Sequence, residues 1–148
     1  MLSNRIFLLG LFLITFIFSC ETERKWKVIE NFANGNVKIQ KEYKIEGTDS
    51  LFFFYQKYNS DGSLLLEGPI INDIREGLWI SYYPDGKVWS KTTFKGGIND
   101  GESISYYTNG KVRYSGFYKE GEKTGEWQTF DSTGTLYNKV DFDLKKSQ

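Results

Sequence analysis

Residues 53–148 form an uninterrupted tandem repeat with a period of 24 residues, and four units begin at Phe53, Gly77, Gly101 and Gly125. Four positions of the unit keep their character. The sixth holds Tyr58, Tyr82, Tyr106 and Phe130, the tenth Gly62, Gly86, Gly110 and Gly134, the twelfth Leu64, Val88, Val112 and Leu136, and the eighteenth Ile70, Phe94, Tyr118 and Phe142. A period of this length indicates stacked units that cannot bury an apolar face alone. The sequence therefore predicts an elongated array.

Each unit carries the signature of a β-hairpin. In residues 83–87, Tyr-Pro-Asp-Gly-Lys, the proline favours the first central position of a type I turn, and Gly86 fits the left-handed position that closes a three-residue loop. Such a loop pairs the sixth position with the twelfth, as in Tyr82 with Val88. We therefore expect the sixth, twelfth and eighteenth positions to share one face. The ninth positions, Asp61, Asp85, Asn109 and Thr133, are interpreted as turn residues, because about 10 Å between successive turns is too far for one calcium ion.

The expected fold class is all-β: an elongated single-layer antiparallel sheet of stacked β-hairpins. Residues 26–52 resemble a degenerate first unit, in which Gly35 takes the turn position and Tyr43 the eighteenth position. Atypical terminal units are common in arrays. No segment after residue 20 has helical periodicity. The predicted repeat domain covers residues 26–148, with units at 26–52, 53–76, 77–100, 101–124 and 125–148.

The N-terminal segment has the pattern of an export signal. An apolar run from Ile6 to Phe18 follows Arg5, and at about 1.5 Å per residue it is shorter than the ~30 Å core of a bilayer. A cleaved signal therefore fits better than a membrane span. The run ends in Ile-Phe-Ser-Cys, which resembles the lipobox of bacterial lipoproteins. We expect residues 1–19 to be a lipoprotein signal peptide, Cys20 to be lipidated, and residues 20–25 to form a short tether.

The composition excludes several classes of function. The chain has no histidine and one cysteine, so triads with histidine and imidazole metal sites are ruled out. Its 19 basic and 19 acidic residues balance, whereas a nucleic-acid-binding module normally shows a clustered basic face. We expect no enzymatic activity, no catalytic residues, no metal, no cofactor and no nucleic-acid partner.

Aromatic residues also recur at the third and thirteenth positions of the unit. These positions are expected on the face opposite the sixth, among polar residues such as Ser81, Ser105 and Lys91. Rigid amphipathic rings are favoured at protein interfaces and can stack on sugars. The alternative is that the rings only cover the second face of a single-layer sheet. The candidate binding surface consists of Tyr55, Trp79, Trp89, Trp127 and Tyr137.

Three segments resemble the MORN-repeat variant family. They are residues 82–88, Tyr-Tyr-Pro-Asp-Gly-Lys-Val, their counterpart at residues 106–112, and the Gly-Glu-Trp of residues 125–127. This group includes bacterial proteins labelled YwqK-like antitoxins. The resemblance covers residues 53–148 well and 26–52 loosely. It implies an elongated antiparallel sheet of stacked hairpins without enzymatic activity.

These observations lead to one functional hypothesis and two alternatives. We expect a bacterial lipoprotein, anchored to the membrane through Cys20 and displayed in the cell envelope outside the cytoplasm. Its repeat surface would bind or scaffold a protein partner, whose identity is unknown. The first alternative is an antitoxin-like or immunity role that neutralises a toxin. The second is a glycan-binding module that uses Trp79, Trp89 and Trp127.

Overall fold

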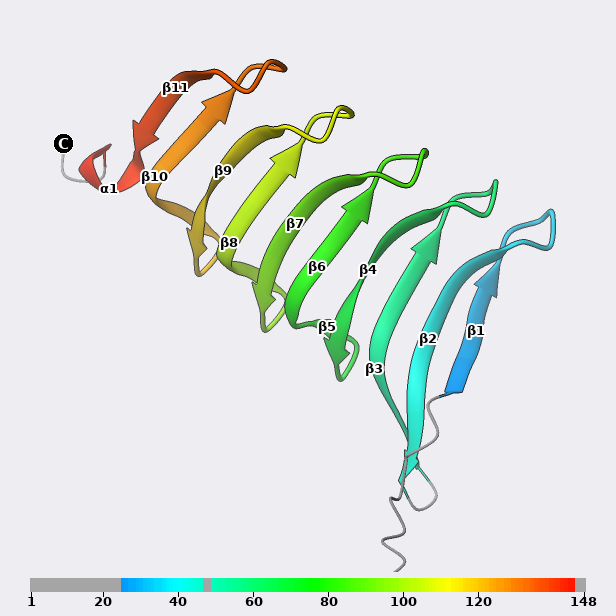
Figure 1. Cartoon of the computed structure of the whole chain (residues 1–148). Helices are drawn as coiled ribbons and strands as arrows, with labels where there is room; N and C mark the ends of the chain where they lie inside the picture. Colours follow the sequence, from blue (N-terminus) through cyan, green and yellow to red (C-terminus); the bar gives the residue numbers. More distant parts are fainter. Residues whose placement is uncertain (1–24, 47–48, 146–148) are drawn as a thin grey trace, which may run out of the picture.

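The computed structural model describes residues 25–46 and 49–145, which form one open antiparallel β-sheet (Figure 1). The strands are β1 (Lys25–Asn31), β2 (Val37–Glu46), β3 (Asp49–Tyr58), β4 (Leu64–Ile71), β5 (Ile74–Arg75), β6 (Gly77–Tyr82), β7 (Val88–Lys95), β8 (Ile98–Tyr106), β9 (Val112–Lys119), β10 (Glu122–Phe130) and β11 (Leu136–Asp141). A short helix, α1 (Phe142–Lys145), follows β11. The all-β array of stacked hairpins is therefore confirmed. The expected signal peptide and Cys20 lie outside the described residues.

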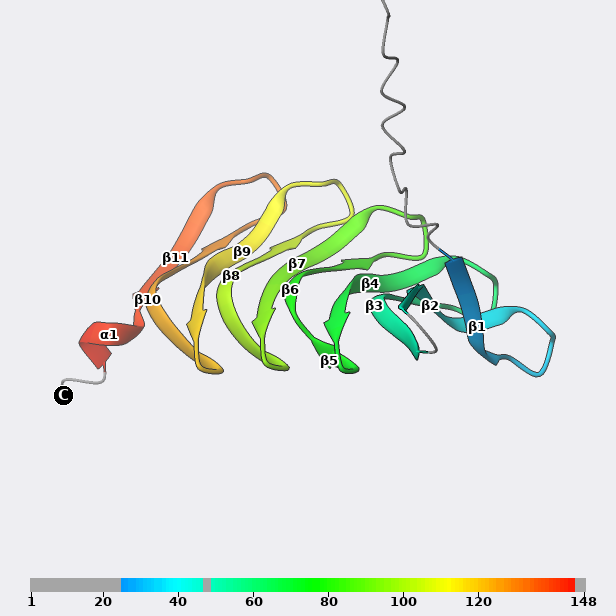
Figure 2. The same ribbon diagram turned by 90° about the horizontal axis from the view of Figure 1, so that it is seen from below.

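The spatial order of the strands follows the chain. The order is β1-β2-β3-β4-β6-β7-β8-β9-β10-β11, with the two-residue β5 paired only to β4. β1 and the β10–β11 hairpin therefore lie at opposite ends of the sheet, and each hairpin is bent along its length (Figures 1 and 2). Within residues 25–46 and 49–145, no helix is both long and apolar enough to cross a membrane.

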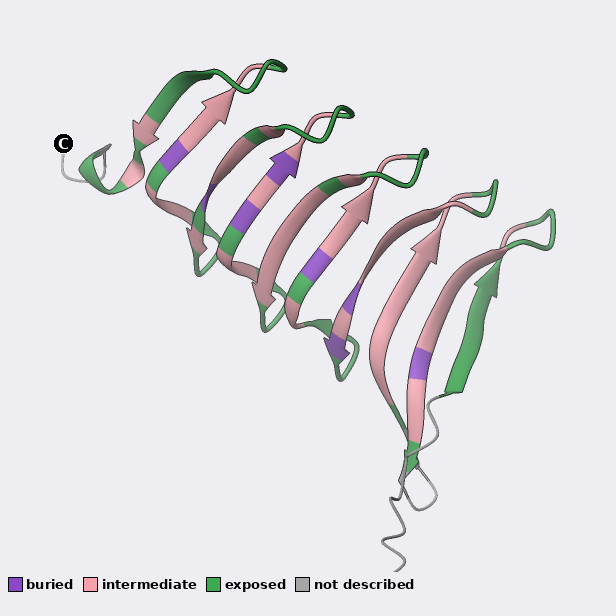
Figure 3. Ribbon diagram, viewed as in Figure 1, coloured by how far each residue is buried: buried purple, intermediate pink, exposed green. Residues whose placement is uncertain are grey.

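Few residues in this single layer are fully buried. Ile70, Trp79 and Trp127 have only 3%, 5% and 5% of their surface exposed. Most other strand residues are half-buried, and β1 is exposed along its whole length (Figure 3). The core is therefore a series of small aromatic clusters along the sheet.

The hairpin loops have the geometry that the sequence predicts. In the second unit, the Tyr83 N–H donates to the Lys87 carbonyl at 2.8 Å, and the Gly86 N–H donates to the Tyr83 carbonyl at 2.9 Å. Gly86 has a φ of 81°, which favours glycine. The same pair of bonds closes the loops at Gly35, Gly62, Gly110 and Gly134. The three-residue loop is thus confirmed in all four units and in the upstream hairpin.

Every hairpin contains a β-bulge that the sequence analysis did not anticipate. Ser81 pairs with Ser90 but Tyr82 pairs with Val88, so Trp89 is the extra residue. Leu65, Arg113 and Tyr137 hold the same place in the other units. Because one extra residue reverses the alternation of side chains, the strand beyond it presents the opposite set of residues to each face.

The bulge corrects the predicted faces. We call the face of Trp79, Ser81, Ser90, Thr92 and Phe94 the tryptophan face. The expectation that the eighteenth position shares a face with the sixth was wrong, because Ile70, Phe94, Tyr118 and Phe142 all lie on the tryptophan face. The sixth and twelfth positions share the other face, the tyrosine face, as predicted. Lys91, expected beside Trp79, pairs with Ile80 on the tyrosine face.

Contacts between units repeat at both ends of the hairpins. Near the turns, the Tyr83 hydroxyl donates to the Tyr106 carbonyl at 2.7 Å, and the Tyr107 hydroxyl donates to the Phe130 carbonyl at 2.9 Å. At the opposite end, the Gly97 N–H donates to the Arg75 carbonyl at 3.0 Å, and the Gly121 N–H donates to the Asn99 carbonyl at 2.9 Å. These bonds hold neighbouring units in a fixed relation.

Candidate functional site

Two buried tryptophans organise the tryptophan face, and both form an equivalent hydrogen bond. The Trp79 indole N–H donates to the Pro69 carbonyl at 2.9 Å, and the Trp127 indole N–H donates to the Phe117 carbonyl at 3.1 Å. Each bond reaches back ten residues to the neighbouring strand of the preceding unit. Each indole is therefore bound to the hairpin before it, which makes it a structural clamp between two units.

A glycine lies under each indole. A Cβ atom added to Gly68 would stand 2.5 Å from the Trp79 ring, and one added to Gly116 would stand 2.3 Å from the Trp127 ring. Both glycines occupy the sixteenth position of their units. Contacts this short do not occur for real Cβ atoms, so position sixteen must be glycine wherever the next unit carries tryptophan at position three.

A cation covers the ring of each buried tryptophan. The Arg75 guanidinium lies 4.4 Å from the Trp79 ring centroid, and the Lys123 ammonium lies 4.1 Å from the Trp127 ring centroid. Both residues hold position twenty-three. Arg75 ends β5, just before β6, and Lys123 lies near the start of β10, the strand that carries Trp127. Such cation–π contacts contribute about 0.5 to 2 kcal/mol, depending on how far the cation is desolvated.

The unit between the two tryptophans departs from this arrangement at all three positions. Ser103 replaces the tryptophan, Thr92 replaces the glycine, and Asn99 replaces the cation. The hydroxyl oxygens of Thr92 and Ser103 lie 3.1 Å apart and share a hydrogen bond. Because two small polar side chains replace a glycine–indole pair, the sheet surface is hollowed at this place.

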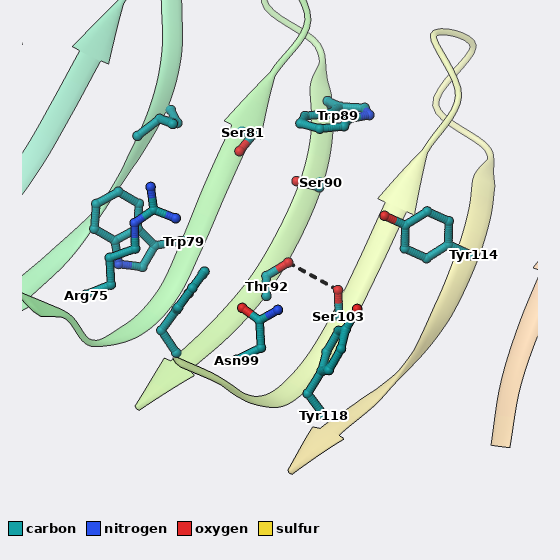
Figure 4. A pocket seen from close by; sticks show the side chains of 12 residues that line it. Arg75, Trp79, Ser81, Trp89, Ser90, Thr92, Asn99, Ser103, Tyr114 and Tyr118 are labelled. Carbon is teal, nitrogen blue, oxygen red and sulfur yellow. Dashed lines mark hydrogen bonds between the residues drawn. The ribbon is translucent and has the colours of Figure 1, made fainter. Parts of the chain in front are cut away.

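A cavity of about 250 Å³ lies over this hydroxyl pair (Figure 4). Figure 4 shows Trp79 with Arg75 on one side of it, Tyr114 and Tyr118 on the other, and Thr92 and Ser103 between them. Its lining residues are Leu66, Arg75, Trp79, Ser81, Trp89, Ser90, Thr92, Phe94, Asn99, Ser103, Tyr114 and Tyr118. A second cavity, of about 400 Å³, shares Tyr114 and Tyr118 and continues beside Trp127.

The cavity is polar but carries little charge. No aspartate or glutamate is among the described residues that line it, and Arg75 supplies a positive charge at its edge. Burial raises the pKa of the Tyr118 hydroxyl, with a smaller contribution from Tyr114, so this hydroxyl is protonated at neutral pH. Ser105 pairs with the lining residues Ser90 and Tyr114 and is fully buried, and its hydroxyl oxygen has no hydrogen-bond partner in the described chain.

The bulge residues form a second surface, which we call the bulge row: Trp89, Arg113 and Tyr137. Trp89 is 43% exposed and Tyr137 is 67% exposed. Arg113 is also exposed, and its guanidinium lies 5.7 Å from the Tyr107 ring centroid. Successive members are separated by two strand spacings, or about 10 Å. The bulge brings these side chains into register on three consecutive hairpins.

The structure divides the predicted aromatic surface into two sets. Trp79 and Trp127 are buried and hold the units together, and Tyr55 is half-buried with its ring centroid 5.6 Å from that of Trp79. Trp89 and Tyr137 remain exposed, on the bulge row. Sequence reasoning missed the cavity. The signal was present in the paired change from Gly68 with Trp79 to Thr92 with Ser103.

Comparison with known families agrees with this architecture. Residues 75–95, 99–120 and 123–143 match the family model described as the MORN repeat variant. Neither curated proteins nor solved structures gave a match. Three successive units of the sheet are therefore MORN-variant repeats, and such an array indicates a binding or scaffolding role built on the repeats.

Proposed function

We propose that this chain of MORN-variant repeats is a non-enzymatic, lipid-anchored module that binds a protein partner in the bacterial envelope. The bulge row carries the proposal. Tryptophan, arginine and tyrosine are the residue types that contribute most to binding at protein interfaces, and here they occupy the same position in three consecutive units. β-bulges often serve to redirect a side chain.

The spacing and charge of the bulge row indicate which surface of a partner would be complementary to it. Trp89 and Tyr137 lie about 20 Å apart, four strand spacings, with the cation of Arg113 between them. No ion pair engages the Arg113 side chain within residues 25–46 and 49–145. The complementary surface is therefore a protein face with a carboxylate between two apolar pockets. A bidentate Arg–carboxylate pair would fix its register.

The binding test uses substitutions that leave the buried clamps intact. We expect Arg113→Ala together with Tyr137→Ala to abolish co-purification of a stoichiometric partner, because both side chains are exposed and contribute contact area. The matched control is Lys95→Ala, which removes an exposed charge elsewhere on the sheet. Retention of the partner by the double variant would exclude the bulge row as the binding surface. Circular dichroism checks that the double variant is folded, so that a loss of the partner can be attributed to the altered surface.

The anchoring part of the proposal rests on the lipobox-like sequence before Cys20 and has its own test. Cells that express the native chain and Cys20→Ala are labelled with a fatty acid and fractionated. We expect label and membrane association in the native chain and loss of both in the variant. An unlabelled, soluble native protein would contradict the anchor and would favour a cytoplasmic partner such as a toxin.

A further inference from the structure

We infer that the central cavity binds a single carbohydrate ring that carries a carboxylate. This inference goes beyond the proposed protein-binding role and concerns the cavity, which shares only Trp89 with the bulge row. The bulge row follows the bulges across three hairpins, whereas the cavity lies over Thr92 and Ser103 within the sheet. Trp89 belongs to both, so the experiments below use variants that separate them.

The base of the cavity suits a ligand with many hydroxyl groups. Five lining side chains offer hydroxyl or amide groups that both donate and accept hydrogen bonds: Ser81, Ser90, Thr92, Asn99 and Ser103. The Ser105 hydroxyl lies in the same face and lacks a partner. Covering such groups with an apolar side chain would leave buried polar atoms unsatisfied, which is unfavourable. A sugar ring carries several hydroxyl groups, each of which can donate and accept hydrogen bonds.

The walls suit the apolar faces of a sugar ring. Trp79 stands on one side of the cavity, and Tyr114 and Tyr118 stand on the other (Figure 4). Phe94 packs beside Trp79, with the two ring centroids 6.2 Å apart. Trp89 also lines the cavity and has 43% of its surface exposed. The carbon-bound hydrogens of a pyranose pack well against such rings, because the aromatic face is electron-rich. The volume of about 250 Å³ is below the about 300 to 1,000 Å³ of sites for drug-sized ligands. One ring is therefore the appropriate size.

The positive charge of Arg75 indicates a negatively charged ligand. Its guanidinium is held over Trp79 and Phe94, at 4.4 Å and 5.1 Å from the two ring centroids, at the edge of the cavity. Within the described chain, its side chain forms no ion pair. An arginine that is fixed by stacking keeps its fork of N–H donors free for a carboxylate. An acidic sugar is therefore favoured over a neutral one.

The array itself contains the filled counterpart of this site. Gly116 and Trp127 occupy the positions that Thr92 and Ser103 hold around the cavity, and there an indole fills the space. The double variant Thr92→Gly, Ser103→Trp rebuilds that pairing in the central unit. It closes the cavity with a packing arrangement that the chain already uses, and it leaves Arg113 and Tyr137 of the bulge row outside the altered site.

The inference is tested by titrating the full-length chain with sodium D-glucuronate and following its amide NMR signals, with D-glucose as the neutral comparison. We expect shifts at Thr92, Asn99 and Ser103 and a dissociation constant on the order of 1 mM, because one ring makes few contacts. Glucose should bind about tenfold more weakly. Equal binding of both sugars would refute the assignment of the carboxylate, and absence of binding to either would refute the site.

Three variants connect any binding to the cavity. Thr92→Gly with Ser103→Trp should abolish the shifts, and Arg75→Met should lower glucuronate affinity about tenfold while glucose affinity stays the same. Arg113→Ala with Tyr137→Ala should leave both affinities unchanged, because it alters only the bulge row. Arg75→Met keeps an apolar side chain over Trp79 and removes only the charge. Unchanged glucuronate binding in this variant would overturn the inference, even if the filled variant failed to fold.

Discussion

At the scale of single residues, the glycines of this chain have two different roles. Gly86 is required for its backbone conformation, because it has a φ of 81° while a Cβ atom would meet nothing within 4 Å. Gly116 is required for space, because a Cβ atom would lie 2.3 Å from the Trp127 ring. The sequence predicted the first role from the turn pattern. The second depends on a neighbouring strand and cannot be derived from local sequence.

Alanine substitutions distinguish the two roles. Gly86→Ala should lower the free energy of unfolding by about 1 to 2 kcal/mol, the cost of a left-handed alanine. Gly116→Ala should cost about 1 to 3 kcal/mol through overpacking and should also raise the exposure of the Trp127 indole. Urea denaturation followed by tryptophan fluorescence measures both quantities. A native-like emission spectrum in Gly116→Ala would contradict the close contact.

Tyr82 gives the protein an alkaline sensitivity. Burial, and then its 2.6 Å hydrogen bond to the Glu67 carboxylate, raise the pKa of the Tyr82 hydroxyl to about 12. Since the folded-state pKa lies above the usual 10.0, this group stabilises the fold fully below pH 10, and the contribution is lost as the pH rises from 10 to about 12. Denaturation midpoints across this range should fall less in Tyr82→Phe. An equal fall in both proteins would exclude Tyr82 as the cause.

At the scale of elements, the turns were predictable and the bulges were not. Turn chemistry is local, so the Pro-Asp-Gly of residues 84–86 was sufficient. A bulge is defined by pairing across two strands. The sixth and twelfth positions pair in the same way whether or not a bulge follows the twelfth, so their pattern does not reveal it. The contact of Gly68 with Trp79 places positions sixteen and three on the same face of the sheet. In a regular hairpin with this loop they would lie on opposite faces, so the contact requires one extra residue in the second strand.

Deletion of a bulge residue should be far more damaging than its substitution. Removing Arg113 forces the rest of β9 to present its other set of side chains, so Tyr118 would leave the Trp127 ring, whose centroid is now 5.0 Å away. We expect a loss of about 3 kcal/mol or more in the free energy of unfolding. Arg113→Ala keeps the bulge and should stay within about 0.5 kcal/mol of the native chain. Similar stabilities in urea denaturation would show that the bulge has no structural role.

At the scale of the whole molecule, neighbouring units do not all pack in the same way. Tryptophan packs on glycine at Trp79 and Trp127, and the unit between them carries Ser103 against Thr92. A tryptophan placed against Thr92 would meet a Cβ atom in the space that glycine leaves free. The two glycine–tryptophan pairings are therefore 48 residues apart, whereas the sequence repeats every 24 residues.

Internal deletions test this difference in packing. Removal of residues 77–124 joins two compatible units and places Trp127 against Gly68, so the shorter chain should unfold cooperatively. Removal of residues 101–124 alone places Trp127 against Thr92 and should yield a less stable protein, although it is one unit longer. Thermal unfolding followed by circular dichroism compares the two chains. A higher midpoint for the one-unit deletion would show that packing adapts unit by unit.

The sequential strand order also determines how the molecule responds to force. Its first and last strands lie at opposite ends of the sheet, so tension between the termini pulls across the backbone hydrogen bonds that join neighbouring strands. These bonds then break one strand pair at a time, beginning at an end such as the fully exposed β1. The array would lengthen in small, reversible steps at low load, which is the behaviour of an extensible spring.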